Sequence, residues 1–140
     1  MPRLSYSVAE VALRVSDLER SKAFYVDILG FEPHLSMENI EFLEIGALNS
    51  PLGRDHPQLL ALFKRDIKLD QATSTFDHIA FEVPEEDFAS ERARYEELGM
   101  VISERDWPDT LPWRGSAFFF RDPDDNVVEI IAAKASAWVS

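Results

Sequence analysis

The sequence predicts an α+β fold made of two βαβββ modules in tandem, and internal repetition is the main observation behind this prediction. A shift of 68 residues along the 140-residue chain places the alternating run "EVALRV" (10–15) on "HIAFEV" (78–83). Each run is followed by a helix-like stretch, and the two stretches end in "LGF" (29–31) and "LGM" (98–100). Three more strand-like runs follow each helix. Since one helix covers only one face of a sheet, a second module gives the other face a partner.

The first module carries a signal for each of its elements. Apolar and polar residues alternate through 10–15, which predicts a strand with one face under a helix. Ser16 with Glu19 forms a capping-box pattern, so we expect the helix to be capped at Ser16. Gly30 is well placed to end that helix in the left-handed conformation. Three further strands are expected in "EPHLSM" (32–37), "IEFLEIGAL" (40–48) and "LLALFKRD" (59–66).

The second module repeats this order. Its helix is expected to follow Pro84, where the acidic run "EED" (85–87) suits the positive end of the helix dipole, and to end at Gly99. In the turn "DPDDN" (122–126), Asp125 stands at a position that favours the left-handed conformation. The remaining strands are expected in "VISERDW" (101–107), "SAFFFRD" (116–122) and "VVEIIAAK" (127–134).

The repeat also sets the expected boundaries. We expect residues 1–140 to form a single domain, with module one at about 8–66, a linker at 67–75 and module two at about 76–134.

Composition narrows the classes of function. Hydrophobic residues make up 46% of the chain and charged residues 29%, which is typical of a globular protein, and no run is long enough to cross a membrane. A formal net charge of −12 argues against nucleic acid as a partner, because phosphate binding needs a basic face. The absence of cysteine excludes disulfides, thiolate metal sites and a cysteine nucleophile, and fits a cytoplasmic protein.

Three stretches carry a family resemblance: "VALRVSDLERSKAFYVDILGFEP" (11–33), "DHIAFEV" (77–83) and "FRDPDDNVVEII" (120–131). With the paired modules, they resemble the vicinal-oxygen-chelate superfamily, which includes glyoxalase I, extradiol dioxygenases and bleomycin-resistance proteins. The resemblance spans residues 8–132. It implies that the curved sheets form an open, barrel-like cup that binds a small molecule, and that the protein is a homodimer.

The resemblance also implies where a metal would bind, at four positions on the first and last strands of the modules. In this chain those positions hold Glu10, Ala61, His78 and Glu129. Alternation along the strands places Glu10, His78 and Glu129 on the faces that turn away from the helices. Ala61 has no ligand atom, and Glu10 stands where related enzymes carry glutamine or histidine. Phe119 stands where extradiol dioxygenases carry an acid–base tyrosine, which argues against ring cleavage.

Two functions remain open. The first is a metal-dependent lyase, isomerase or dioxygenase-like enzyme acting on a small oxygenated organic molecule. Glu10, His78 and Glu129 would hold one divalent ion per site, with Mn, Fe, Mg, Zn and Ni all compatible, and Glu10 or Glu129 would act as the catalytic base. The second is a metal-free protein that binds a cationic antibiotic of the bleomycin type, which the net charge of −12 and the vacancy at Ala61 favour.

Five further residues are candidates for substrate binding. Trp107 and Trp113 flank the loop "PDTLP", where they could wall a pocket or equally seal a hydrophobic edge or a dimer contact. Arg114 follows Trp113 directly. Phe119 and Arg14 are expected to face the cup. Arg14 and Glu82 occupy equivalent positions in the two modules, so an ion pair between them is an alternative role for Arg14.

Overall fold

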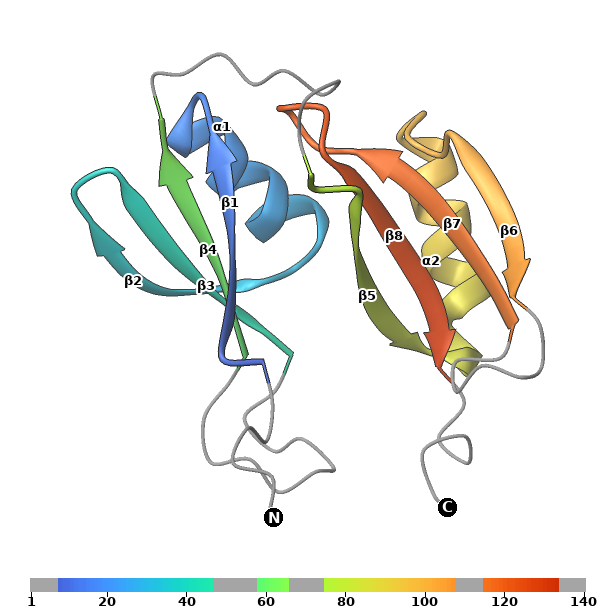
Figure 1. The fold of residues 1–140 in the computed structure, drawn as a ribbon. Coiled ribbons are helices and arrows are strands. Elements are labelled where there is room, and N and C mark those ends of the chain that lie inside the picture. Colours follow the sequence, from blue (N-terminus) through green and yellow to red (C-terminus); the bar gives the residue numbers. More distant parts are fainter. Residues whose placement is uncertain (1–7, 47–57, 66–74, 108–114, 134–140) are drawn as a thin grey trace. The chain divides into compact units, whose positions relative to one another are not determined.

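A computed structural model describes residues 8–46, 58–65, 75–107 and 115–133 (Figure 1). The chain divides into two compact units, Met1–Asp70 and Gln71–Ser140, and each is described by itself. No helix among the described residues is long and apolar enough to cross a membrane.

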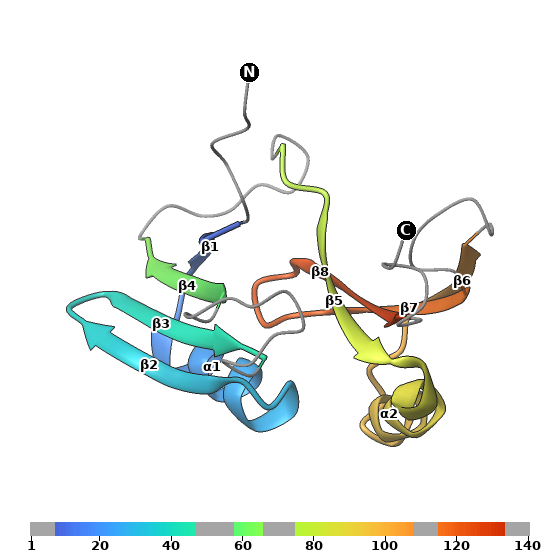
Figure 2. The same ribbon diagram turned by 90° about the horizontal axis from the view of Figure 1, so that it is seen from below.

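Unit one contains a four-stranded sheet in the order β1-β4-β3-β2. Strands β1 and β4 are parallel, and the other neighbours are antiparallel. The helices lie against one face of this sheet (Figure 2). The elements are β1 (Glu10–Val15), α1 (Leu18–Ala23), the π-helical turn η1 (Phe24–Ile28), β2 (Glu32–Met37), β3 (Ile40–Ile45) and β4 (Gln58–Lys64).

The first helix begins one residue later than the capping-box pattern predicts. Its N-cap is Asp17, whose Oδ1 accepts the backbone N–H of Arg20 at 3.0 Å. The expected cap at Ser16 is therefore wrong: its hydroxyl accepts a hydrogen bond from the Arg20 guanidinium instead. Both residue types cap helices well, and the end of β1 at Val15 leaves Asp17 at the first helical turn. The helix ends at Gly30, whose φ of 81° confirms the left-handed stop.

Unit two has the same architecture. Its sheet order is β5-β8-β7-β6, with β5 and β8 parallel and α2 on one face. Glu85, Glu86 and Asp87 lie in the first turn of α2 as expected, and Gly99 (φ 71°) and Asp125 (φ 64°) adopt the left-handed conformation. The elements are β5 (His78–Pro84), α2 (Glu85–Glu97), β6 (Ser103–Trp107), β7 (Gly115–Arg121) and β8 (Val127–Ala133).

Each unit has its core between its sheet and its helix. In unit one, the core contains buried side chains of β1, β3 and β4 together with Tyr25, which is fully buried. In unit two, the ring of Tyr95 from α2 stacks on the ring of Phe120, with 4.6 Å between the ring centroids. It also packs against Phe118, at a centroid distance of 5.3 Å. The face of each sheet that its own helix does not cover is called the open face, and it carries the candidate site residues. The predicted α+β fold of two βαβββ modules is confirmed.

Candidate metal centre

His78 and Glu129 meet on the open face of unit two. Strands β5 and β8 run parallel with Ala80 opposite Glu129, so His78 and Glu129 are diagonal neighbours on the same face. Nε2 of His78 lies 3.2 Å from Oε2 of Glu129, and the Glu129 carboxylate is fully buried while the His78 side chain is 34% exposed. A buried carboxylate is therefore held beside an imidazole that solvent can reach.

The second nitrogen of the same ring is also engaged. Nδ1 of His78 lies 2.5 Å from Oδ2 of Asp77, whose side chain is 93% exposed. Asp77 precedes the first residue of β5, so strand alternation does not force its side chain to the opposite face from His78. Sequence reasoning gave Asp77 no role because it lies just before the alternating run 78–83; the signal that could have found it is the "DH" dipeptide at the strand start.

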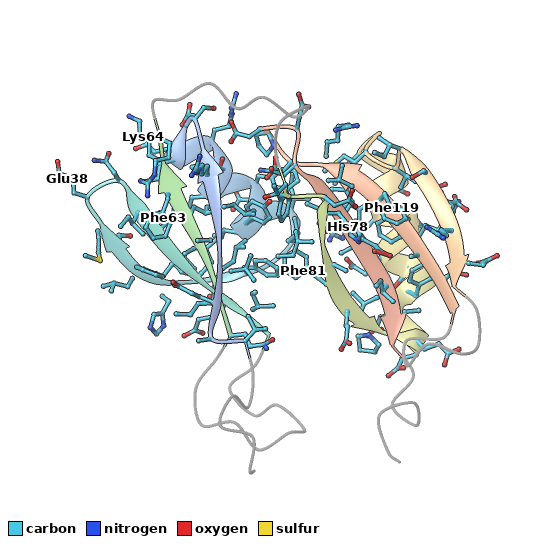
Figure 3. All side chains as sticks on the ribbon, in the orientation of Figure 1. Glu38, Phe63, Lys64, His78, Phe81 and Phe119 are labelled. Atoms are coloured by element: carbon cyan, nitrogen blue, oxygen red, sulfur yellow. The ribbon has the colours of Figure 1, made fainter. Side chains whose placement is uncertain are left out.

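Phe119 lies beside this pair. It stands on β7 directly opposite Glu129, and its ring centroid is 6.0 Å from that of His78 in an edge-on arrangement. Figure 3 shows the two labelled rings close together on unit two. Phe119 therefore gives the pair an apolar neighbour with no proton to transfer, and its role in substrate binding stays a prediction.

Glu10 lies on the other unit. It is the first residue of β1 and is exposed, on the same open face as Ala12, which stands opposite Ala61. Ala61, which stands at the second of the four metal positions that the resemblance implies, is fully buried and offers no ligand atom. Because Glu10 belongs to unit one and the His78–Glu129 pair to unit two, their meeting at one ion stays a prediction. Within residues 8–46, 58–65, 75–107 and 115–133, no group of three or more His, Cys, Asp or Glu side chains could hold a metal ion.

The remaining candidates are placed only in part. Arg14 on β1 is exposed, and Glu82 on β5 shares its open face with His78. Although the Glu82 side chain keeps access to solvent, partial burial raises the pKa of its carboxyl. The Arg14–Glu82 ion pair would join the two units and stays a prediction. Trp113 and Arg114 lie outside the described residues, as does the side chain of Trp107.

The donor set of the His78–Glu129 pair fits a divalent cation. One imidazole nitrogen and one carboxylate oxygen suit Mn²⁺, Fe²⁺, Zn²⁺ or Ni²⁺, and their 3.2 Å separation is short enough for both atoms to bind the same ion. The carboxylate–histidine contact of Asp77 with Nδ1 is the arrangement that commonly orients a metal-binding histidine.

Comparison with known proteins gives relatives along nearly the whole chain. Glutathione transferase FosA from Serratia marcescens is 29% identical over 131 residues, covering 94% of this chain and 84% of that protein. Metallothiol transferase FosB from Staphylococcus epidermidis is 28% identical over 127 residues, covering 89% of this chain and 80% of that protein.

A solved structure agrees with the fold. It is a point variant of the fosfomycin resistance protein FosX from Listeria monocytogenes, in complex with Mn(II) and 1S,2S-dihydroxypropylphosphonic acid. It matches with a TM-score of 0.68 and 22% identity, covering 96% of this chain and 95% of that chain. The family model for the Glyoxalase/Bleomycin resistance protein/Dioxygenase superfamily matches residues 7–130. This chain therefore belongs to the glyoxalase/bleomycin resistance protein/dioxygenase superfamily.

Proposed function

We propose that the protein is a divalent-metal-dependent enzyme that modifies a small oxygenated molecule, and that this substrate is a phosphonate of the fosfomycin type. The observation that carries the proposal is the His78–Glu129 pair, one nitrogen and one oxygen donor 3.2 Å apart on neighbouring strands. The relatives support the substrate class, since the names FosA, FosB and FosX belong to two thiol transferases and a fosfomycin resistance protein.

The three residues of the candidate metal centre would have different roles. His78, through Nε2, and the Glu129 carboxylate would hold the ion, with Glu10 as the third ligand. A bound divalent ion would supply Lewis acidity to a substrate oxygen. Because Glu129 is fully buried and Glu10 is exposed, Glu10 is the carboxylate better placed to leave the ion and act as the base.

The chemistry that fits is the opening of a strained C–O bond. Fosfomycin carries an epoxide, and a thiol or water would add to one epoxide carbon while the C–O bond at that carbon breaks. Glu10 would accept the proton of the nucleophile and return it to the released oxygen, so that protons balance. Phe119 offers no acid–base group, which favours such an addition over cleavage of a catechol ring.

The experiment joins metal analysis with product detection. The protein is purified without chelators, stripped, and reloaded separately with Mn²⁺, Mg²⁺, Fe²⁺, Zn²⁺ and Ni²⁺. Fosfomycin turnover is followed by ³¹P NMR with glutathione, with another small thiol, or with water alone. We expect about one ion per chain and metal-dependent loss of the fosfomycin signal. Failure of every ion to bind would end the proposal.

A matched control exists within the chain. Nδ1 of His34 lies 2.8 Å from Oε1 of Glu44 in unit one, so this pair has the same residue types at a similar distance. We expect His78→Ala and Glu129→Gln to abolish metal binding, and His34→Ala to leave it unchanged. Unchanged metal content in the His78→Ala, Glu129→Gln double variant would place the ion elsewhere and refute the assignment.

The net charge of −12 favours a second candidate, a metal-free protein that binds a cationic antibiotic. Calorimetric titration of chelator-treated protein with metal-free bleomycin tests it. Binding that weakens steeply with added salt, in a protein that no metal restores, would support this function over the enzyme. Light scattering of the same sample tests the expected homodimer.

A further inference from the structure

Each ring nitrogen of His78 faces a carboxylate, and only one of these two carboxylates, that of Glu129, is a proposed metal ligand. Nε2 faces the buried Glu129 carboxylate at 3.2 Å, whereas Nδ1 faces the exposed Asp77 carboxylate at 2.5 Å. An ionised carboxylate can only accept hydrogen bonds, so the contact with Asp77 requires a proton on Nδ1. With Nδ1 occupied by this hydrogen bond, Nε2 is the ring atom left to bind an ion, and it lies beside the Glu129 carboxylate.

The backbone explains how adjacent residues can make this contact. Successive side chains in a strand point to opposite faces, which would separate Asp77 from His78. However, β5 begins at His78, and a bend at Thr75 precedes it. Asp77 therefore lies outside the pleat, and its carboxylate can turn back to the edge of the ring.

We propose that Asp77 is a positioning residue that keeps Nδ1 of His78 protonated and fixes the ring so that Nε2 is presented to the metal ion. This inference rests on the proposed function, because it assigns Asp77 a role toward the ion that His78 and Glu129 would hold. Carboxylates that orient a ligating histidine in this way contribute about 10- to 100-fold to metal affinity or activity.

The high exposure of Asp77 determines how it acts. With 93% of its side chain accessible, its charge is screened by water, and its long-range attraction for the ion is small. Its effect is therefore expected through the hydrogen bond. Asp77→Asn, whose amide oxygen still accepts the Nδ1 proton, should retain most of the metal affinity that Asp77→Ala loses.

The first arm of the test uses metal-free protein. The chain has three histidines, so the ring signals of His78 can be assigned in ¹⁵N-labelled protein by comparison with a His78→Gln variant. We expect wild-type protein to show a proton on Nδ1 that exchanges slowly with water, and Asp77→Ala to lose this protected signal. Glu97→Ala, which removes an exposed carboxylate at the end of α2, is the control and should keep the signal. A wild-type ring without a proton on Nδ1 would overturn the inference.

The second arm measures Mn²⁺ affinity by the electron paramagnetic resonance signal of the free ion. We expect Asp77→Ala to weaken binding by roughly 10- to 100-fold, and Asp77→Asn and Glu97→Ala to remain close to wild type. Wild-type affinity in Asp77→Ala, together with its loss in His78→Ala, would refute the role of Asp77 and leave the proposed function intact. If wild-type protein binds no Mn²⁺, the proposed function fails, and the protonation of Nδ1 alone decides the inference.

Discussion

Removal of the His78 imidazole tests the electrostatics of the candidate centre without any metal. Glu129 is fully buried and its Oε2 lies 3.2 Å from Nε2 of His78, whose side chain is 34% exposed. Breaking a fully buried ion pair costs about 3–5 kcal/mol, and losing an exposed one costs about 0–1 kcal/mol. Because this pair has one buried and one partly exposed member, we expect His78→Ala to lower the free energy of unfolding by about 2 kcal/mol. That loss corresponds to a roughly 30-fold change in the unfolding equilibrium constant.

A second substitution separates this electrostatic cost from lost packing. Glu129→Gln removes the buried charge and keeps the shape, so we expect it alone to change the free energy of unfolding by less than about 1 kcal/mol. In the double variant no buried charge is left without its imidazole, and at least about 1 kcal/mol of the His78→Ala loss should be recovered. Fully additive losses would refute the coupling of the two side chains.

The assay is urea unfolding in the presence of a chelator, followed by tryptophan fluorescence. All the tryptophans belong to the unit Gln71–Ser140, which contains the pair, so the fluorescence reports on this unit. They are Trp107, Trp113 and Trp138.

Three further predictions concern stability and are checked by the same unfolding assay, with circular dichroism as the probe for unit one. Asp17→Ala should lower the free energy of unfolding by about 1 kcal/mol, because the backbone N–H of Arg20 loses the Asp17 carboxylate as acceptor. Ser16→Ala should lower it by less. The reverse order would show that the cap is at Ser16. Tyr95→Ala should lower the free energy of unfolding by about 3–5 kcal/mol, since the ring is buried between α2 and β7. Tyr95→Phe keeps the stacked ring and should lower it far less. Burial raises the pKa of Glu82 above 4.5 in the folded chain, so its contribution to stability is largest at low pH and is lost as the pH rises through the raised pKa. Glu82→Gln should therefore be more stable than wild type at neutral pH and lose this advantage in acid, and a difference independent of pH would contradict the assignment.

The repeat in the sequence was enough to predict the fold. It located every strand that the structure shows, because alternation and turn residues are local signals that tertiary packing did not override here. It also placed His78 and Glu129 on one face, since alternation fixes the face of a strand residue once the apolar face is known. The distance between their side chains required the parallel register of β5 and β8, which a single sequence does not specify.

The features that the sequence did not predict depend on where elements begin and end. Asp17 and Ser16 are both good caps, and only the end of β1 decides between them. The π-helical turn Phe24–Ile28 has no pattern that separates it from an ordinary helix. The contact of Asp77 with His78 was not predicted, because Asp77 precedes the strand and alternation does not say where its side chain points. A boundary shift of one residue therefore decides the cap, and the place of Asp77 just outside β5 permits its contact with His78.

The net charge of the chain predicts that a bound metal ion changes which ligands the protein attracts. A net charge of −12 repels a phosphonate and attracts a cationic antibiotic, so the metal-free protein is electrostatically suited to the second function. A divalent ion held by Glu129 and Glu10 would offset their two negative charges, and its charge would act in a region that water screens poorly beside the buried Glu129. Phosphonate affinity should then require the ion, even before any bond changes. Equal binding of a phosphonate to stripped and reloaded protein would contradict this argument.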